Sequence, residues 1–188
     1  GLLAIRIPRS SPKQDGNFQW LMPFDANDPR ADSATWHFDG SLMDGEVAAL
    51  RVTGFGIAIT ADNGDLLPIA RGAPPRWCAT AAAAEAWALL QVLRHTAFAP
   101  KMRTDCLSLL TTSRQGTALA TGPGRPLARI WREIADILDG DITTLTRHGL
   151  LIWQPAHQTV HAVGERICSD GRKLSTVNWR ANRLVDAL

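Results

Sequence analysis

The feature that most constrains the fold is a succession of three strand signals in the first half of the chain. In residues 34–41 apolar and polar side chains alternate, which is the two-residue period of a half-buried strand. Residues 52–61 predict a second strand, and the hairpin signal Asp62-Asn-Gly-Asp65 leads into a third strand at 66–71. These signals predict an antiparallel three-stranded meander.

The rest of the chain alternates between helical and strand patterns. Its expected elements are a helix over 80–97 capped by Thr80, a strand at 102–105, a helix over 127–138, a buried strand at 150–153 and a last helix from 177. Strands followed by interleaved helices and strands predict an α/β domain, with helices packed on a mixed sheet.

Residues 1–32 differ from the remainder. They contain four prolines and no sustained periodicity, so we expect an irregular extension or linker before a domain that covers residues 33–188. Aromatic side chains such as Phe18 and Trp20 could fix this extension to a surface.

Composition excludes several classes of protein. No apolar run approaches the roughly 20 residues of a membrane span, and no signal peptide is evident at the start. Three cysteines without close pairing predict reduced thiols, and therefore the nucleus or cytoplasm. Arginine outnumbers lysine by 17 to 3, a bias that suits contacts with phosphate.

Three acidic residues occupy positions that can be read in two ways. Asp39 ends the first strand, where it is a solvated turn residue or a metal ligand held by a rigid scaffold. Glu85 lies inside an otherwise apolar helix, either on its one solvated edge or pointing inward. Asp105 follows the fourth strand, where it could simply cap the next helix.

The order of these acids resembles the ribonuclease H branch of the ribonuclease H-like superfamily, over roughly residues 35–188. The resemblance implies a five-stranded mixed sheet, made of the meander plus two parallel strands, with helices on both faces. It is carried by Asp39-Gly-Ser41, Ala84-Glu85, Thr104-Asp105, Trp153-Gln-Pro-Ala-His157 and Asn182-Arg-Leu-Val-Asp186.

The resemblance further implies that Asp39, Glu85, Asp105 and Asp186 converge on two Mg²⁺ ions, for which Mn²⁺ can substitute. Crowded carboxylates repel one another unless cations neutralise them, and oxygen ligands favour Mg²⁺ or Mn²⁺ over zinc. The implied activity is hydrolysis of the RNA strand of RNA/DNA hybrids by a two-metal mechanism.

Other residues receive roles from the same resemblance. His161 is expected to be a mobile catalytic histidine. Candidate contacts to nucleic acid are Ser41, Thr80 and Asn182 from the resemblance, together with Arg125, Arg129 and Arg132, whose charges lie on the other side of the helix at 127–138 from its apolar face. The three arginines can also form an ordinary solvated helix face. Trp36, Trp87 and Trp153 lie in apolar runs, so we expect them in the core and not as platforms on which bases stack.

The chain also departs from the family. Ala82 and Leu107 stand where the family has polar side chains that contact the minor groove of the hybrid, and the loop 162–175 is long. A divergent member is therefore expected, such as the ribonuclease H part of a retroelement polyprotein, linked to neighbouring domains. Alternatives are a scaffold or nucleic-acid-binding domain without turnover, or an enzyme acting on double-stranded RNA or branched DNA.

A zinc site is a further alternative. His157, His161 and Cys168 are spaced like three zinc ligands, but the sequence supplies no fourth ligand at a suitable distance. Loop histidines are the favoured interpretation.

Overall fold

The computed structural model describes residues 16–23, 25, 28, 30–31, 33–46 and 51–188. Its strands are β1 Asn17–Met22, β2 Thr35–Met43, β3 Val52–Thr60, β4 Leu66–Ala73, β5 Lys101–Thr104 and β6 Leu151–Trp153. Its helices are α1 Ala81–Arg94, α2 Leu107–Gln115, α3 Thr117–Ala120, α4 Ala128–Ile137, α5 Thr144–Arg147, the 3₁₀ turn η1 Val160–Ala162 and α6 Thr176–Val185.

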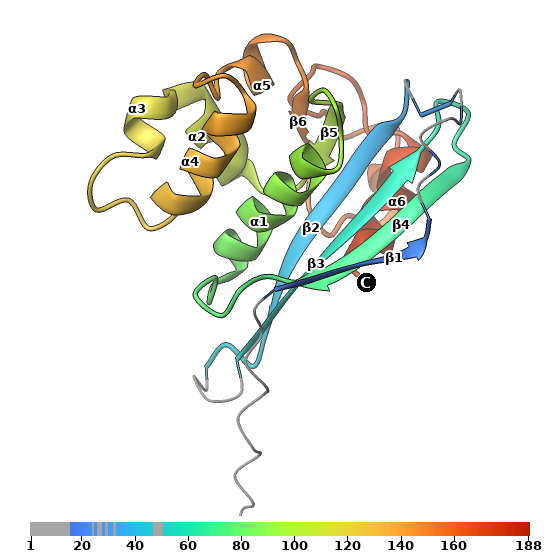
Figure 1. Cartoon of the computed structure of the whole chain (residues 1–188). Helices are drawn as coiled ribbons and strands as arrows, with labels where there is room; N and C mark the ends of the chain where they lie inside the picture. The colour runs from blue at the N-terminus through green and yellow to red at the C-terminus, as the bar shows by residue number, and fades with distance from the viewer. Residues whose placement is uncertain (1–15, 24, 26–27, 29, 32, 47–50) are drawn as a thin grey trace, which may run out of the picture.

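The strands form one open sheet in the order β1-β4-β3-β2-β5-β6 (Figure 1). β2, β3 and β4 are the expected antiparallel meander. β5 lies parallel to β2, and β6 lies parallel to β5. The α/β class and the mixed sheet are therefore confirmed.

The predicted number of five strands is wrong, because β1 adds a sixth. This strand lies in the segment expected to be irregular, and it pairs antiparallel with β4 at the sheet edge. Phe18 and Trp20 alternate with more exposed neighbours and pack against the main core, where the Phe18 ring stacks on His95 at 4.0 Å between centroids. The pattern is too short to predict a strand by itself, and it forms one here because β4 pairs with it. Residues 1–15 lie outside the described part of the chain.

Helices cover both faces of the sheet, α1 in front of it and α6 behind it in Figure 1. Two glycines show how closely they approach. A Cβ atom on Gly40 of β2 would lie 2.2 Å from the backbone nitrogen of Glu85 in α1. A Cβ atom on Gly56 of β3 would lie 2.7 Å from the carbonyl oxygen of Val185 in α6. Both helices therefore touch the backbone of the sheet beside Asp39, which lies directly opposite Gly56.

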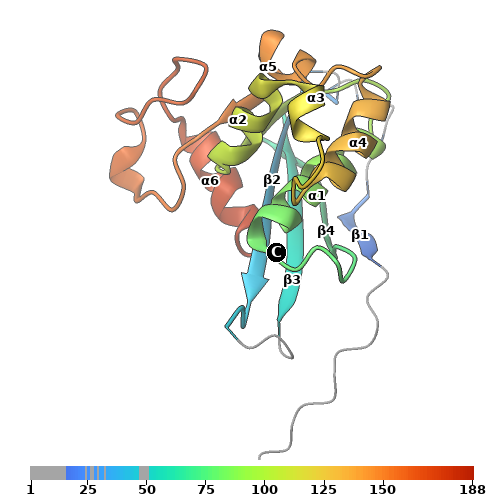
Figure 2. The ribbon, with the colours of Figure 1, turned by 90° about the vertical axis from the view of Figure 1, so that its left-hand side faces the viewer.

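The main core lies between the sheet and α1. Trp36 and Phe38 of β2 are buried there against the apolar side chains of α1, as the alternation in β2 predicts. The N-terminus of α1 is capped by Thr80, whose hydroxyl oxygen accepts a 3.1 Å bond from the backbone nitrogen of Ala83. The helices α2 to α4 gather beside α1 and form a helical layer with it (Figure 2).

Candidate metal centre

The candidate centre lies where two parallel strands separate. β2 and β5 are paired as far as His37 and Arg103, and each presents an aspartate two residues further on. These are Asp39, still within β2, and Asp105, directly after β5. The carboxyl ends of adjacent parallel strands are a common position for ligand sites in α/β sheets.

Glu85 reaches this gap from α1. The residue is 7% exposed, and its Oε2 atom has no hydrogen-bond partner. The helix can place it there because Gly40 leaves no side chain between the strand and the helix backbone. Of the two readings of Glu85, the structure has the inward-facing one. A buried carboxyl oxygen without a hydrogen-bond partner is unusual, and this one is available to bind a cation.

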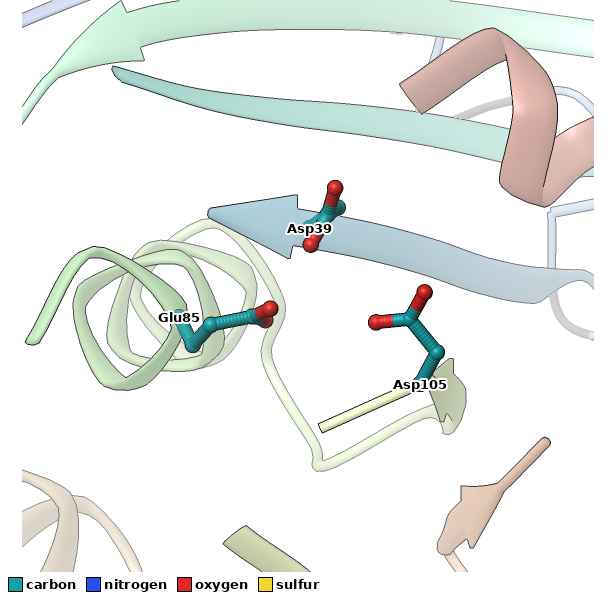
Figure 3. Close-up of side chains that lie close together, drawn as sticks. All are labelled: Asp39, Glu85 and Asp105. Atoms are coloured by element: carbon teal, nitrogen blue, oxygen red, sulfur yellow. The ribbon is translucent and has the colours of Figure 1, made fainter. Parts of the chain in front are cut away.

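The three carboxylates point toward one another (Figure 3). One ligand atom from each of Asp39, Glu85 and Asp105 lies within 4.8 Å of the others. The N-cap of α2 is Cys106, so Asp105 does not cap that helix and its carboxylate remains available. Asp39 Oδ1 also accepts a 2.7 Å bond from the backbone nitrogen of Gly40, which holds its carboxylate in place.

The electrostatics of the site favour a bound cation. Burial, aided by a hydrogen bond to Asp39 and by its charge, raises the pKa of Glu85 to about 12. Burial and the charge of Asp39 also raise the pKa of Asp105. A divalent cation would offset this repulsion, and an all-oxygen donor set suits hard cations such as Mg²⁺. The acidic triad can therefore bind a metal ion.

Asp186 approaches the triad from the C-terminal end of α6. Burial and a hydrogen bond with Asp39 raise the pKa of Asp186 to about 7. The buried amide of Asn182 lies one helical turn earlier and donates to Oδ2 of Asp105 at 3.2 Å and to Oδ1 of Asp186 at 3.5 Å. α6 therefore adds a fourth carboxylate and an amide that orients two of the acids.

The residue Gln154 supports Asn182 and received no role from the sequence. Its Nε2 atom donates a 2.7 Å hydrogen bond to Oδ1 of Asn182. That bond leaves the amide nitrogen of Asn182 facing the acids. A polar residue between an apolar strand and a proline was the only sequence signal for this role.

His157, rather than His161, is the histidine beside the acids. Its Nδ1 atom lies 3.8 Å from Oδ2 of Asp186, and its backbone has the unusual φ of 46°. His161 is an exposed residue of η1. The resemblance alone did not anticipate this placement.

Four of the candidate nucleic-acid residues divide into two groups. Thr80 and Arg125 line one pocket of about 290 Å³ above the buried ring of Trp131. Arg129 instead stacks over Trp77 at 4.4 Å, and Arg132 donates to the carbonyl oxygen of Thr121 at 3.3 Å. The structure therefore brings only Arg125 of the three arginines to the Thr80 pocket.

Ser41 and the proposed zinc ligands can also be placed. Ser41 is exposed on β2, two residues beyond Asp39. Cys168 is buried in a second, smaller apolar cluster with Ile152, Ala162 and Leu174. Within the described residues, the acidic triad is the only group of three or more potential ligands close enough to share a metal, so His157, His161 and Cys168 do not form a zinc site.

Comparisons with known proteins add no family assignment. The sequence matches no model of a known protein family and no curated protein. Among the described residues, no helix has both the length and the apolar character that crossing a bilayer requires. Function must therefore be argued from the geometry of the site.

Proposed function

We propose that this chain is a divalent-metal-dependent endonuclease that hydrolyses the RNA strand of RNA/DNA hybrids, similar to ribonuclease H. The observation that carries the proposal is the convergence of Asp39, Glu85 and Asp105 from three separate elements, with a buried and unpartnered oxygen on Glu85. Clustered buried acids destabilise an empty site, which makes a purely structural role a poor explanation for them.

The donor set fits Mg²⁺ or Mn²⁺. Asp39, Glu85, Asp105 and Asp186 would hold two such ions, which when bound activate water and stabilise the departing oxygen of a phosphodiester. Asn182 keeps the carboxylates of Asp105 and Asp186 oriented through its amide. His157 faces Asp186 and is exposed, so it can exchange protons with solvent beside the reacting phosphate.

The Thr80 pocket supplies a binding surface where the N-terminus of α1, the helix that carries Glu85, meets α2, α3 and α4. The hydroxyl groups of Thr80, Ser108 and Thr112 and the guanidinium of Arg125 line it together. Hydroxyl and guanidinium groups are common donors to phosphate oxygens, so this pocket would contact a nucleic-acid backbone. The substrate would cross α1 with one phosphate at the metal centre.

A second candidate is a nucleic-acid-binding domain that has lost turnover. It is favoured by Leu107, which lies two residues after Asp105. This side chain is 52% exposed and cannot donate a hydrogen bond to a 2′-hydroxyl. In that case, neighbouring domains of a longer polypeptide would supply the activity.

Cleavage of end-labelled substrates tests the proposal. The protein should cut the RNA strand of a hybrid in Mg²⁺ or Mn²⁺, leaving 5′-phosphate and 3′-hydroxyl ends, and Asp105→Asn should abolish cutting. The exposed Asp136 of α4 provides a matched control, because Asp136→Asn should cut normally. Metal-dependent hybrid binding without cutting would favour the second candidate, and a panel with double-stranded RNA and branched DNA separates the substrates.

A further inference from the structure

The connection between β6 and α6 folds as a unit with its own small core. Ile152, Ala162, Cys168 and Leu174 are buried together, and Trp179 of α6 packs on them. The indole nitrogen of Trp179 donates a 2.8 Å bond to the carbonyl oxygen of Gln158. This connection projects from the molecule at the left of Figure 2, and its internal packing gives it a defined shape.

Two anchors hold the unit against the sheet. Ser169 accepts a 2.8 Å bond from the backbone nitrogen of Trp153 and donates its own backbone nitrogen to the Trp153 carbonyl at 2.9 Å. The buried guanidinium of Arg103 in β5 donates to Asp170 at 3.0 Å. The segment 165–170 is therefore fixed opposite the end of β6.

A pocket of about 580 Å³ lies between this segment and Trp153. Its apolar walls include Pro155, the half-buried Trp153 and Ile167, which is 61% exposed. Arg166 and Glu165 add one cationic and one acidic side chain, and Arg166 forms no ion pair within the described residues. The pocket thus combines an aromatic and aliphatic surface with two charged groups of opposite sign. Trp153, which we expected in the core, packs partly buried against it and also lines this pocket.

The pocket adjoins the candidate metal centre. The indole nitrogen of Trp153 donates a 2.8 Å bond to the carbonyl oxygen of Asp105. Pro155 and Gln158 line both this pocket and the adjoining hollow that contains His157 and Asp186. A polymer with one phosphate at the acids could therefore place a neighbouring group in the pocket.

We propose that the pocket takes a nucleotide whose base lies outside the double helix, next to the phosphate at the metal centre. This inference rests on the proposed nuclease function and narrows its substrate to nucleic acid with an unpaired nucleotide near the cleavage site. A base within a duplex is already stacked, whereas an unpaired base gains from contact with Trp153 and Ile167. Arg166 can contact the attached phosphate, and the neighbouring acids would hold the next phosphate through bound metal, which together favour a nucleotide over an apolar peptide.

Binding of fluorescent oligonucleotides tests this assignment in Ca²⁺ or EDTA, where turnover is not required. The probes are a blunt RNA/DNA hybrid and the same hybrid with two unpaired adenines at each of its four strand ends in turn. At least one overhang should tighten binding roughly fivefold or more, the low end of the effect of stacking one base on an aromatic side chain.

Matched variants on the same loop locate the effect. Arg166→Glu and Ile167→Ser should abolish the preference for the overhang. Arg172→Glu and Val160→Ser should preserve it, because Arg172 and Val160 are exposed on this loop but do not line the pocket.

Equal affinity for blunt and overhanging hybrids would overturn the assignment. A preference for the overhang that survives both pocket variants would also overturn it. In either case a polypeptide would be the better occupant of the pocket. Cleavage of hybrids without any overhang preference would remove this inference alone. Failure to bind or cleave any hybrid would remove the proposed function as well.

Discussion

The side-chain amide of Asn182 donates a 3.2 Å hydrogen bond to Oδ2 of Asp105, joining the last helix to the end of β5. The same amide nitrogen faces Asp186, and its oxygen accepts from Gln154. A single buried side chain thus sets the relative positions of two acids that are far apart in sequence. The candidate site depends on this link as well as on the acids themselves.

Asn182→Ala should weaken both the site and the fold. Partners that orient metal ligands typically contribute about 10–100-fold to metal affinity or activity, so we expect a loss of that size in Mn²⁺ affinity and cleavage. The unpaired Gln154 amide should cost about 1–3 kcal/mol of unfolding free energy. Calorimetry and urea denaturation measure the two effects. Asn178→Ala, one turn earlier on α6, is the control and should leave Mn²⁺ affinity unchanged.

Glu85→Gln should separate metal binding from folding. Because the pKa of Glu85 is raised to about 12, the metal-free protein carries a neutral side chain there at pH 7, and glutamine is its neutral isostere. The unfolding free energy in EDTA should change by less than the roughly 1 kcal/mol that is typical of a point mutation. Stabilisation by Mn²⁺ should disappear, whereas Glu133→Gln on α4 should retain it. Full Mn²⁺ stabilisation of Glu85→Gln would show that Glu85 is not a ligand.

Stability of the metal-free protein should fall as the pH rises. The native state keeps the Asp186 proton up to about pH 7, whereas an unshifted aspartate releases it near 3.8. This group therefore contributes stability that is fully present below about pH 4 and is lost through about pH 7. Urea midpoints in EDTA from pH 4 to 8 should decline more in the natural protein than in Asp186→Asn. Parallel curves would contradict the raised pKa.

The two loop histidines should differ in function. His157→Ala removes the imidazole that faces Asp186, and we expect turnover to fall about 10–100-fold, as for other groups that support a metal ligand. His161→Ala should leave turnover unchanged, because that side chain is exposed in η1. Single-turnover cleavage of a labelled hybrid compares the two. The reverse order of effects would return the catalytic role to His161.

Local patterns predicted the elements that carry the acids, because β2 alternates clearly and α1 has a strong cap and an apolar surface. They could not predict β1, whose burial depends on pairing with β4. The resemblance favoured His161 over His157, because nothing in the sequence shows that His157 lies 3.8 Å from Asp186. Local patterns also could not show that Arg129 stacks over Trp77, because the two residues are distant in sequence.

The most direct test of the metal centre is a crystal structure of the protein soaked in Mn²⁺, with the ions located by anomalous scattering. The account predicts one or two peaks between β2 and β5, bound by carboxylate oxygens of Asp39, Glu85 and Asp105 at roughly the 2.0–2.6 Å of hard-cation sites. Occupied Mn²⁺ sites elsewhere with none between these acids, or carboxylates that turn apart in the soaked crystal, would contradict it.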